Sequence, residues 1–347
     1  MTRLGLSVER AALPTLHFET SHLRRLSGRH GLYEHAEHDV PRRAHGYTTD
    51  DNARALVVLS HAALRHDNGA RYLLPRCAAY VMQARVRRGW LNRKADSGRW
   101  AGDRGPDDTH GRALWGLGAL VAAGVLVDEA AAVFANGCDL DSPHPRANAY
   151  AALGAVAVLP TGLPCAERML ESAVRCIPRF GSDRAWPWPE PHLTYANARL
   201  PEALIAAGSA IEDAGLVEQG IVLLEWLSSV ESGAAGFSFT PVGGRGPGDG
   251  TPGFDQQPIE AWAMADACLR AYRVTRSAVW LDRAEQAAMW FLGHNDVGVS
   301  LYDCATGAGF DGLEDRGVNS NRGAESTLAA LGALCVLVDC RLERRGL

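Results

Sequence analysis

The sequence lacks the motifs that would assign it to several common functional classes. None of its eight cysteines forms a C-x-x-C pair, which argues against a zinc ribbon and a thioredoxin-type motif. A serine-hydrolase G-x-S-x-G is missing, and the glycine-rich stretch Gly243–Gly248 is only a proline-interrupted imitation of a phosphate-binding loop. No calcium-loop spacing is present either. We therefore expect neither a metal nor a cofactor.

The chain also lacks a strong excess of charge and a long apolar run. A formal net charge of -5 gives no reason to expect a nucleic acid or an anionic membrane as partner. The apolar stretches are broken by Gly, Asp or Pro well short of a membrane span, and the first residues show no secretion signal. We expect a cytoplasmic protein whose cysteines are buried free thiols.

What the sequence does contain is a short signature that recurs at the start of six apolar segments. Its clearest copy is Thr48-Thr-Asp-Asp-Asn-Ala-Arg-Ala-Leu56. A polar, often acidic lead-in followed by small and then apolar residues is typical of a helix start. When the six copies are superposed, one position of the signature is occupied by Arg54, Arg112, Tyr150, Glu202, Glu260 and Glu325. They lie 38 to 65 residues apart, which is the length of one helix pair, so six copies predict six helical hairpins.

Two kinds of helix alternate along the chain. The signature helices are rich in Ala, Gly and Leu and almost uncharged after their first turn, as expected of buried inner helices. They are predicted at 50–64, 107–123, 145–158, 195–211, 256–275 and 322–342. Outer helices, several with a charged stripe, are predicted at 20–26, 70–87, 127–137, 165–180, 216–229 and 278–292. We predict an all-α fold, an (α/α)6 toroid formed by residues 1–347 as a single domain; a superhelical solenoid is the alternative.

Two connecting segments differ from the rest. Residues 89–100 are rich in Trp and Gly and are predicted to form a strand, a turn and a second strand. Residues 233–253 are rich in Gly and Pro and are long enough for a lid or a disordered excursion.

In a toroid the inner helices all begin at one rim, where acidic and aromatic residues would gather. Two opposed carboxyl groups cleave a glycosidic bond when one stays protonated, and aromatic rings stack on sugar faces. The candidate catalytic residues are Asp51, Asp108, Asp255, Asp311 and Glu325. We predict Asp108 as general acid, with Asp255 opposite it and Glu190 opposite Asp51. The candidate substrate-binding residues are Asp50, Arg54, Trp100, Asp107, His110, Arg112, Trp186, Trp188, Glu190, Tyr195, Gln256, Glu260 and Asn321.

Each candidate also has a purely structural interpretation. Aspartates at helix starts can be caps, and the equivalent arginines and glutamates can form a buried ion-pair network. Trp186 and Trp188 lie between prolines in a rigid loop, which favours a sugar platform over loop packing. His110 and His192 are expected to be hydrogen-bonding partners at the rim.

Three phrases of the sequence resemble a known bacterial domain. They are Gly46-Tyr-Thr-Thr-Asp-Asp-Asn-Ala-Arg54, Asp107-Asp-Thr-His-Gly-Arg-Ala-Leu-Trp115 and Asn319-Ser-Asn-Arg-Gly-Ala-Glu-Ser-Thr327. Similar phrases occur in a bacterial (α/α)6 domain that is found alone or fused behind glycosyltransferases, and that resembles the six-hairpin glycosidase superfamily. The resemblance implies a toroid, a carbohydrate context and a functional link to a glycosyltransferase.

Together these patterns predict a glycoside hydrolase-like enzyme that cleaves an oligosaccharide or a glycan end with inversion. Two alternatives stay open. A non-catalytic glycan-binding or regulatory module serving a glycosyltransferase would have rim aromatics without opposed acids. A sugar epimerase or isomerase would need histidine bases, such as His110 and His192, that converge in the cup.

Overall fold

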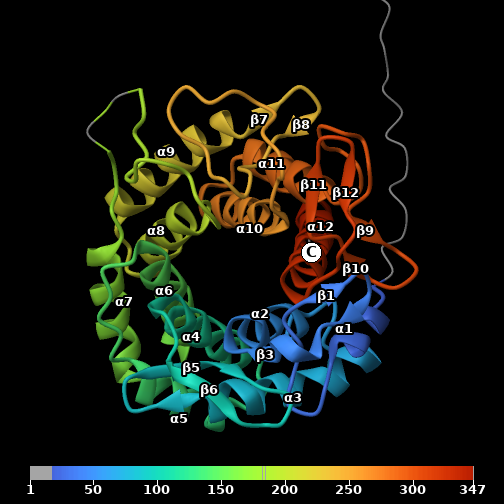
Figure 1. Ribbon diagram of the computed structural model, residues 1–347. Coiled ribbons are helices and arrows are strands. Elements are labelled where there is room, and N and C mark those ends of the chain that lie inside the picture. Colours follow the sequence, from blue (N-terminus) through green and yellow to red (C-terminus); the bar gives the residue numbers. More distant parts are fainter. Residues whose placement is uncertain (1–17, 182, 184, 347) are drawn as a thin grey trace, which may run out of the picture.

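The computed structural model describes residues 18–346 except 182 and 184, and these residues form a closed ring of two helical layers (Figure 1). The inner helices are α2 (Thr49–Leu59), α4 (Asp107–Ala122), α6 (Pro145–Val158), α8 (Arg199–Ala210), α10 (Pro258–Thr275) and α12 (Ala324–Arg345). The outer helices are α1 (Ser21–Leu26), α3 (Asn68–Gln83), α5 (Val127–Gly137), α7 (Pro164–Cys176), α9 (Ala214–Val230) and α11 (Ala278–Met289). Because α12 packs against α2, the ring closes, and the (α/α)6 toroid is confirmed in place of the solenoid.

The acidic residues at the inner helix starts lie inside the first turn, not at the capping position. Thr48 caps α2, since its hydroxyl accepts a hydrogen bond from the Asp51 amide at 3.2 Å. Pro106 occupies the capping position of α4, one residue before Asp107. Carboxylates in the first turn are stabilised by the positive end of the helix dipole. Their side chains therefore remain available for contacts across the rim.

Short strands connect the helices. A small sheet contains β3 (Tyr47–Thr48), β4 (Arg85–Val86), β5 (Gly89–Lys94) and β6 (Trp100–Arg104), so the predicted strand–turn–strand is confirmed as the β5–β6 pair. Among the described residues, the remaining strands form four hairpins, and there are two 3-10 turns. These are β1 (Ala36–Glu37) with β2 (Val40–Pro41), β7 (Ser232–Gly233) with β8 (Gly236–Phe237), β9 (Tyr302–Asp303) with β10 (Ala308–Gly309), β11 (Gly312–Glu314) with β12 (Gly317–Asn319), η1 (Arg43–His45) and η2 (Leu159–Thr161).

The Gly- and Pro-rich segment 233–253 is fixed against the ring, so its prediction as a disordered excursion is wrong. Phe237, Phe239 and Arg245 are buried, and the backbone of Arg245 pairs with that of Leu193 in both directions at 2.8 and 3.0 Å. Two buried phenylalanines anchor the segment because burying each ring removes a large apolar surface from water. The segment carries Val242 to the rim.

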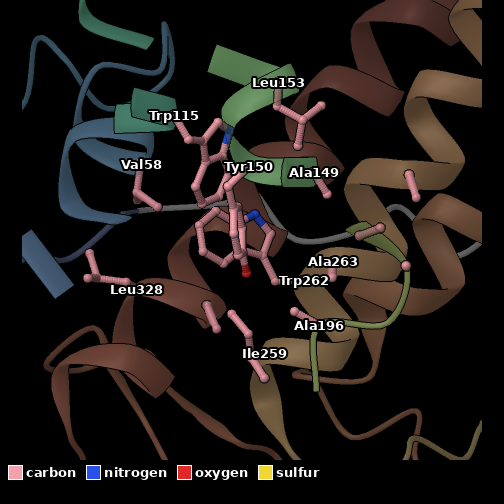
Figure 2. Close-up of a cluster of buried hydrophobic side chains, with 14 of the residues drawn as sticks. Val58, Trp115, Ala149, Tyr150, Leu153, Ala196, Ile259, Trp262, Ala263 and Leu328 are labelled. Atoms are coloured by element: carbon pink, nitrogen blue, oxygen red, sulfur yellow. The ribbon is translucent and has the colours of Figure 1, made fainter. Parts of the chain in front are cut away.

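Aromatic residues of the inner helices fill the axis of the ring. Trp115, Tyr150 and Trp262 pack together, with ring centroids 5.2 and 5.4 Å from that of Trp115 (Figure 2). The Arg199 guanidinium lies against both tryptophans and pairs with Glu202 at 2.6 Å. This group forms the floor of the toroid.

A small cavity of about 140 Å³ lies on the far side of the floor, towards the C-terminal ends of the inner helices. Among its lining residues, Asp339 accepts from Arg273 at 2.9 Å and lies 3.3 Å from His61. In the part of the chain that the structure describes, no helix combines the length and hydropathy needed to cross a membrane.

Candidate functional site

Two adjoining cavities open at the rim where the inner helices begin. The first holds about 400 Å³ and is lined by Glu34, His35, Thr48, Asp50, Asp51, Arg112, Pro258, Asp311, Gly323 and Ser326. The second holds about 500 Å³ and is lined by His192, Leu193, Thr194, Tyr195, Gly243, Gly244 and Ile259. Both are also lined by Arg54, Val242, Gln257 and Glu325, and we call the joint space the rim cup. Pockets of this size match small-molecule sites.

One arginine joins two carboxyl groups in the wall of the rim cup. The Arg54 guanidinium donates to Asp51 at 2.8 Å within α2 and pairs with Glu325 from α12. Asp51 is buried and also accepts from the Thr48 hydroxyl at 2.6 Å, whereas the Glu325 side chain is 48% exposed. The two carboxyl groups therefore share a cation but differ in their access to solvent.

A second arginine links α2 to α4. Arg112 donates to Asp50 at 3.0 Å and lies 3.3 Å from Asp108. The Tyr195 hydroxyl donates to the same Asp108 oxygen at 2.6 Å. Burial raises the pKa of Tyr195, and the adjacent Asp108 charge adds to this. Tyr195 thus remains a hydrogen-bond donor at neutral pH. Arg112 and Tyr195 are the donors that orient the carboxyl groups of Asp50 and Asp108.

The environments of the two adjacent aspartates push their pKa values apart. Burial raises the pKa of Asp51 to about 6; the Arg54 charge opposes this rise, and the Glu325 charge supports it. Burial acts on Asp50 in the same direction, but the charges of Arg112 and Arg54 outweigh it and hold its pKa below the ordinary value. Neighbouring carboxyl groups that differ in this way can serve as proton donor and permanent anion.

Solved structures similar to the whole chain include sugar-converting and sugar-cleaving enzymes. A sugar epimerase from a ruminal bacterium gives a TM-score of 0.69 at 10% identity, covering 93% of this chain and 95% of that one. A D-mannose isomerase gives 0.70 at 11% identity, with 92% and 94% covered. A GH76 α-mannanase of Bacteroides thetaiotaomicron gives 0.63 at 11% identity, with 94% of each covered.

These structures share the toroid fold of this chain. No family model matches the sequence, and no curated protein sequence matches it. At these identities the likeness extends to the fold of this toroid and no further. The rim cup therefore has to be interpreted from its own residues.

The three predicted tryptophans do not line the rim cup, so the sugar-platform prediction is wrong. Trp188 is buried and stacks on Trp226 of α9 with ring centroids 5.9 Å apart, and Trp186 meets the same ring edge-on at 5.0 Å. Trp100 packs against Tyr80 with ring centroids 5.1 Å apart. An apolar partner on the outer layer holds each ring away from the cup.

Two polar candidates also have structural partners outside the rim cup. His110 contacts the Gly137 carbonyl oxygen at 2.7 Å and packs on Trp90, towards the outer layer. Gln256 is fully buried, where it donates to Asp296 at 2.7 Å and accepts from the Phe239 amide at 3.1 Å. Both side chains tie neighbouring elements together.

In neither predicted pair of opposed acids do both residues line the rim cup. Glu190 pairs with Arg146 at 2.7 Å, outside the wall that contains Asp51. Asp255 lies beside Gly312 of β11, where one of its carboxyl oxygens is buried with no hydrogen-bond partner. Asp108 reaches the cup only through Arg112 and Tyr195, which both line it.

Other predicted site residues position the rim. Glu260 accepts from the Asn197 amide at 3.0 Å and fixes the loop before α8. Asn321 accepts from the His38 amide at 2.9 Å and thereby holds the β1–β2 hairpin. Asp311 does line the cup, while its carboxylate accepts from the Gly323 amide at 2.6 Å at the start of α12. Asp107 does not line the cup and pairs with Arg104 at 3.0 Å.

Several cup residues were missed by the sequence analysis. Gln257 and Val242 line both cavities, and Glu34 and His35 line the first. Gln257 directly follows the predicted Gln256. The signature therefore predicted where this helix begins, but not which of the two neighbouring side chains points into the cup. The other three lie on connecting loops, which carry no helical periodicity.

Proposed function

We propose that the rim cup binds a saccharide and hydrolyses a glycosidic bond, with Asp51 as general acid and Glu325 as its carboxylate partner. One observation carries this proposal: a buried carboxyl group with a pKa of about 6 shares Arg54 with an exposed carboxylate in the same cavity wall. Glycosidases need one protonated and one ionised carboxyl group beside the scissile bond.

In this proposal each cup residue has a separate task. Asp51 donates its proton to the leaving-group oxygen, and Glu325 either activates water or attacks the sugar carbon. Arg54 pairs with both carboxyl groups and holds them in the same wall. Asp50, oriented by Arg112, accepts hydrogen bonds from sugar hydroxyl groups, while Asp108 orients Arg112 and Tyr195 in the cup wall. Inversion stays our expectation for the stereochemistry.

Conversion of a sugar by epimerisation or isomerisation is the second candidate. His35 and His192 lie at the two cavities of the rim cup, one in each, and a histidine base can remove a proton from a sugar carbon. The similar epimerase and isomerase structures also favour it. A functional link to a glycosyltransferase stays a prediction from the resemblance.

The test is incubation of the protein with a panel of α- and β-linked oligosaccharides and free sugars, followed by NMR. The wild type should release a product that Asp51→Asn and Glu325→Gln reduce by about 10²- to 10⁴-fold. Asp107→Asn is the matched control, since that carboxylate also begins an inner helix but pairs with Arg104 outside the cup. Activity should fall as the pH rises above about 6, because Asp51 then loses its proton.

The same spectra separate the remaining outcomes. The first anomer released distinguishes inversion from retention. An epimer without cleavage, lost in His35→Asn or His192→Asn, would replace hydrolysis by the second candidate. If no sugar is changed while one raises the melting temperature, the rim cup is a binding module and the catalytic proposal is wrong.

A further inference from the structure

A cluster of two histidines and one glutamate lies at the mouth of the rim cup. The ligand atoms of Glu34, His35 and His45 all lie within 4.8 Å of one another. One Glu34 carboxyl oxygen is 3.6 Å from His35 Nε2, and the two imidazole rings meet edge-on with centroids 5.1 Å apart. Metal–ligand bonds of about 2.0–2.2 Å place ligand atoms roughly 3–4 Å apart. Small side-chain movements would therefore bring the three groups onto one ion.

A neighbouring arginine orients this cluster. Arg93 of β5 donates to the second carboxyl oxygen of Glu34 and to the backbone carbonyl of His45. Glu34 thus turns its other oxygen towards His35, and the segment that carries His45 is held in place. Such outer partners are typical of metal sites, where they fix the orientation of the ligands. The positive charge of Arg93 opposes cation binding, so we expect micromolar affinity and not a tight structural site.

Exposure and location indicate which kind of ion would bind. The His35 side chain is 50% exposed, and three protein ligands leave coordination positions open to solvent. Imidazole and carboxylate ligands together suit Zn²⁺ and similar divalent transition metals better than Mg²⁺ or Ca²⁺. Glu34 and His35 also line the first cavity, which contains Asp51.

We propose that Glu34, His35 and His45 bind a divalent transition-metal ion, with Zn²⁺ as the representative, and that its open positions face the rim cup. The absence of C-x-x-C pairs and of a calcium-loop spacing predicts no metal, but the β1–β2 hairpin and η1 bring these three residues together in space. The proposal concerns binding of the ion alone, so it stands or falls separately from the glycosidase proposal.

The test is isothermal titration of chelator-treated protein with Zn²⁺ alone, supported by elemental analysis after dialysis. The wild type should bind one ion per chain, and His35→Asn and His45→Asn should each weaken binding at least about tenfold. His38→Asn is the matched control, because His38 lies in the same loop outside the cluster and its positive φ of 52° suits asparagine. This control should bind as the wild type does.

Spectroscopy and melting make the outcome decisive. Co²⁺ should give a visible ligand-field band in the wild type that is lost in His45→Asn. Glu34→Gln, which keeps an oxygen acceptor for Arg93, should weaken binding as well. Equal melting temperatures with chelator present would show that the variants are folded. The absence of binding by the wild type, or equal loss in His38→Asn and His45→Asn, would overturn the proposal.

Discussion

Arg199 shows how one residue can hold the centre of the toroid. Its side chain is fully buried, and its guanidinium carbon lies 4.7 and 4.9 Å from the ring centroids of Trp115 and Trp262. The same group pairs with Glu202 at 2.6 Å and Asp266 at 2.8 Å. Removing one partner from a buried ion pair leaves an uncompensated charge away from water. The arginine therefore stabilises the two acids as much as it fills space.

Replacing Arg199 by alanine should lower the free energy of unfolding by about 3–5 kcal/mol, because the buried Glu202 and the partly buried Asp266 lose their cation. Arg344→Ala is the control: it also removes an arginine paired with two acids, Asp282 and Glu285, but at the surface. That change should cost about 1 kcal/mol or less. Urea unfolding at pH 7 measures both, and equal losses would contradict the role of the buried network.

At this scale the sequence predicted which residues are charged at the rim but not how their side chains are directed. Arg54 and Glu325 occupy the same position in two copies of the signature, and in the structure their side chains form an ion pair. Trp186 and Trp188 were expected in the cup because the loop is rigid, yet a tryptophan in α9, far along the chain, provides a better apolar partner. Such a competing partner belongs to tertiary packing, which the local sequence does not encode.

Among the elements, α4 and α6 approach each other closely through small residues. A methyl group added to Gly154 would lie 2.5 Å from the Leu114 carbonyl oxygen, and one added to Gly118 would lie 2.5 Å from the Gly154 carbonyl oxygen. Glycines at these positions allow backbone-to-backbone contact between two inner helices. The diameter of the inner ring therefore depends on residues without side chains.

Gly154→Ala should destabilise the fold by about 1–3 kcal/mol, because the added methyl group forces the two helices apart. This prediction opposes intrinsic helix propensity, by which alanine is favoured over glycine by about 1 kcal/mol. Gly317→Ala on β12 is the control, since nothing lies within 4 Å of the added methyl group. Thermal unfolding of both variants decides the sign; a more stable Gly154→Ala would show that the ring can expand freely.

Element boundaries were predictable where local signals were strong. The predicted ranges 127–137 and 145–158 match α5 and α6 to the residue, and α6 begins with a proline at its first position. The fourth inner helix was expected from 195 but begins at Arg199, because Glu260 holds the amides of Ala196 and Asn197 in a loop. A buried acid from another hairpin thus overrides the local pattern.

For the whole molecule, stability depends on closing the ring between its first and last hairpins. The short helix α1 contacts α3 and α12, and its His22 is buried at this junction. The His22 amide donates to the Thr306 carbonyl at 2.9 Å, and its Nε2 lies 2.8 Å from the Arg322 carbonyl oxygen. One histidine thus joins segments about 300 residues apart in the chain.

Ring closure should weaken in acid because of His22. Burial lowers the pKa of His22 below its ordinary value of 6.5, and the positive charges of Arg322 and Arg25 lower it further. A depressed histidine pKa contributes stability that is present above about 6.5 and is lost as the pH falls towards and through the folded-state value. Asp51 has the opposite effect on stability. Its pKa is about 6 in the folded state and about 3.9 in the unfolded chain, so Asp51 adds stability as the pH falls from about 6 to about 3.9.

A difference measurement isolates the histidine. Urea unfolding of the wild type and His22→Gln between pH 8 and 5 should show the wild type losing more stability as the pH falls, because glutamine stays uncharged while it can still donate to the Arg322 carbonyl. Asp51 and the buried His110 are present in both proteins, so their titration cancels in the difference. Parallel curves would mean that folding does not lower the pKa of His22, and would contradict the prediction.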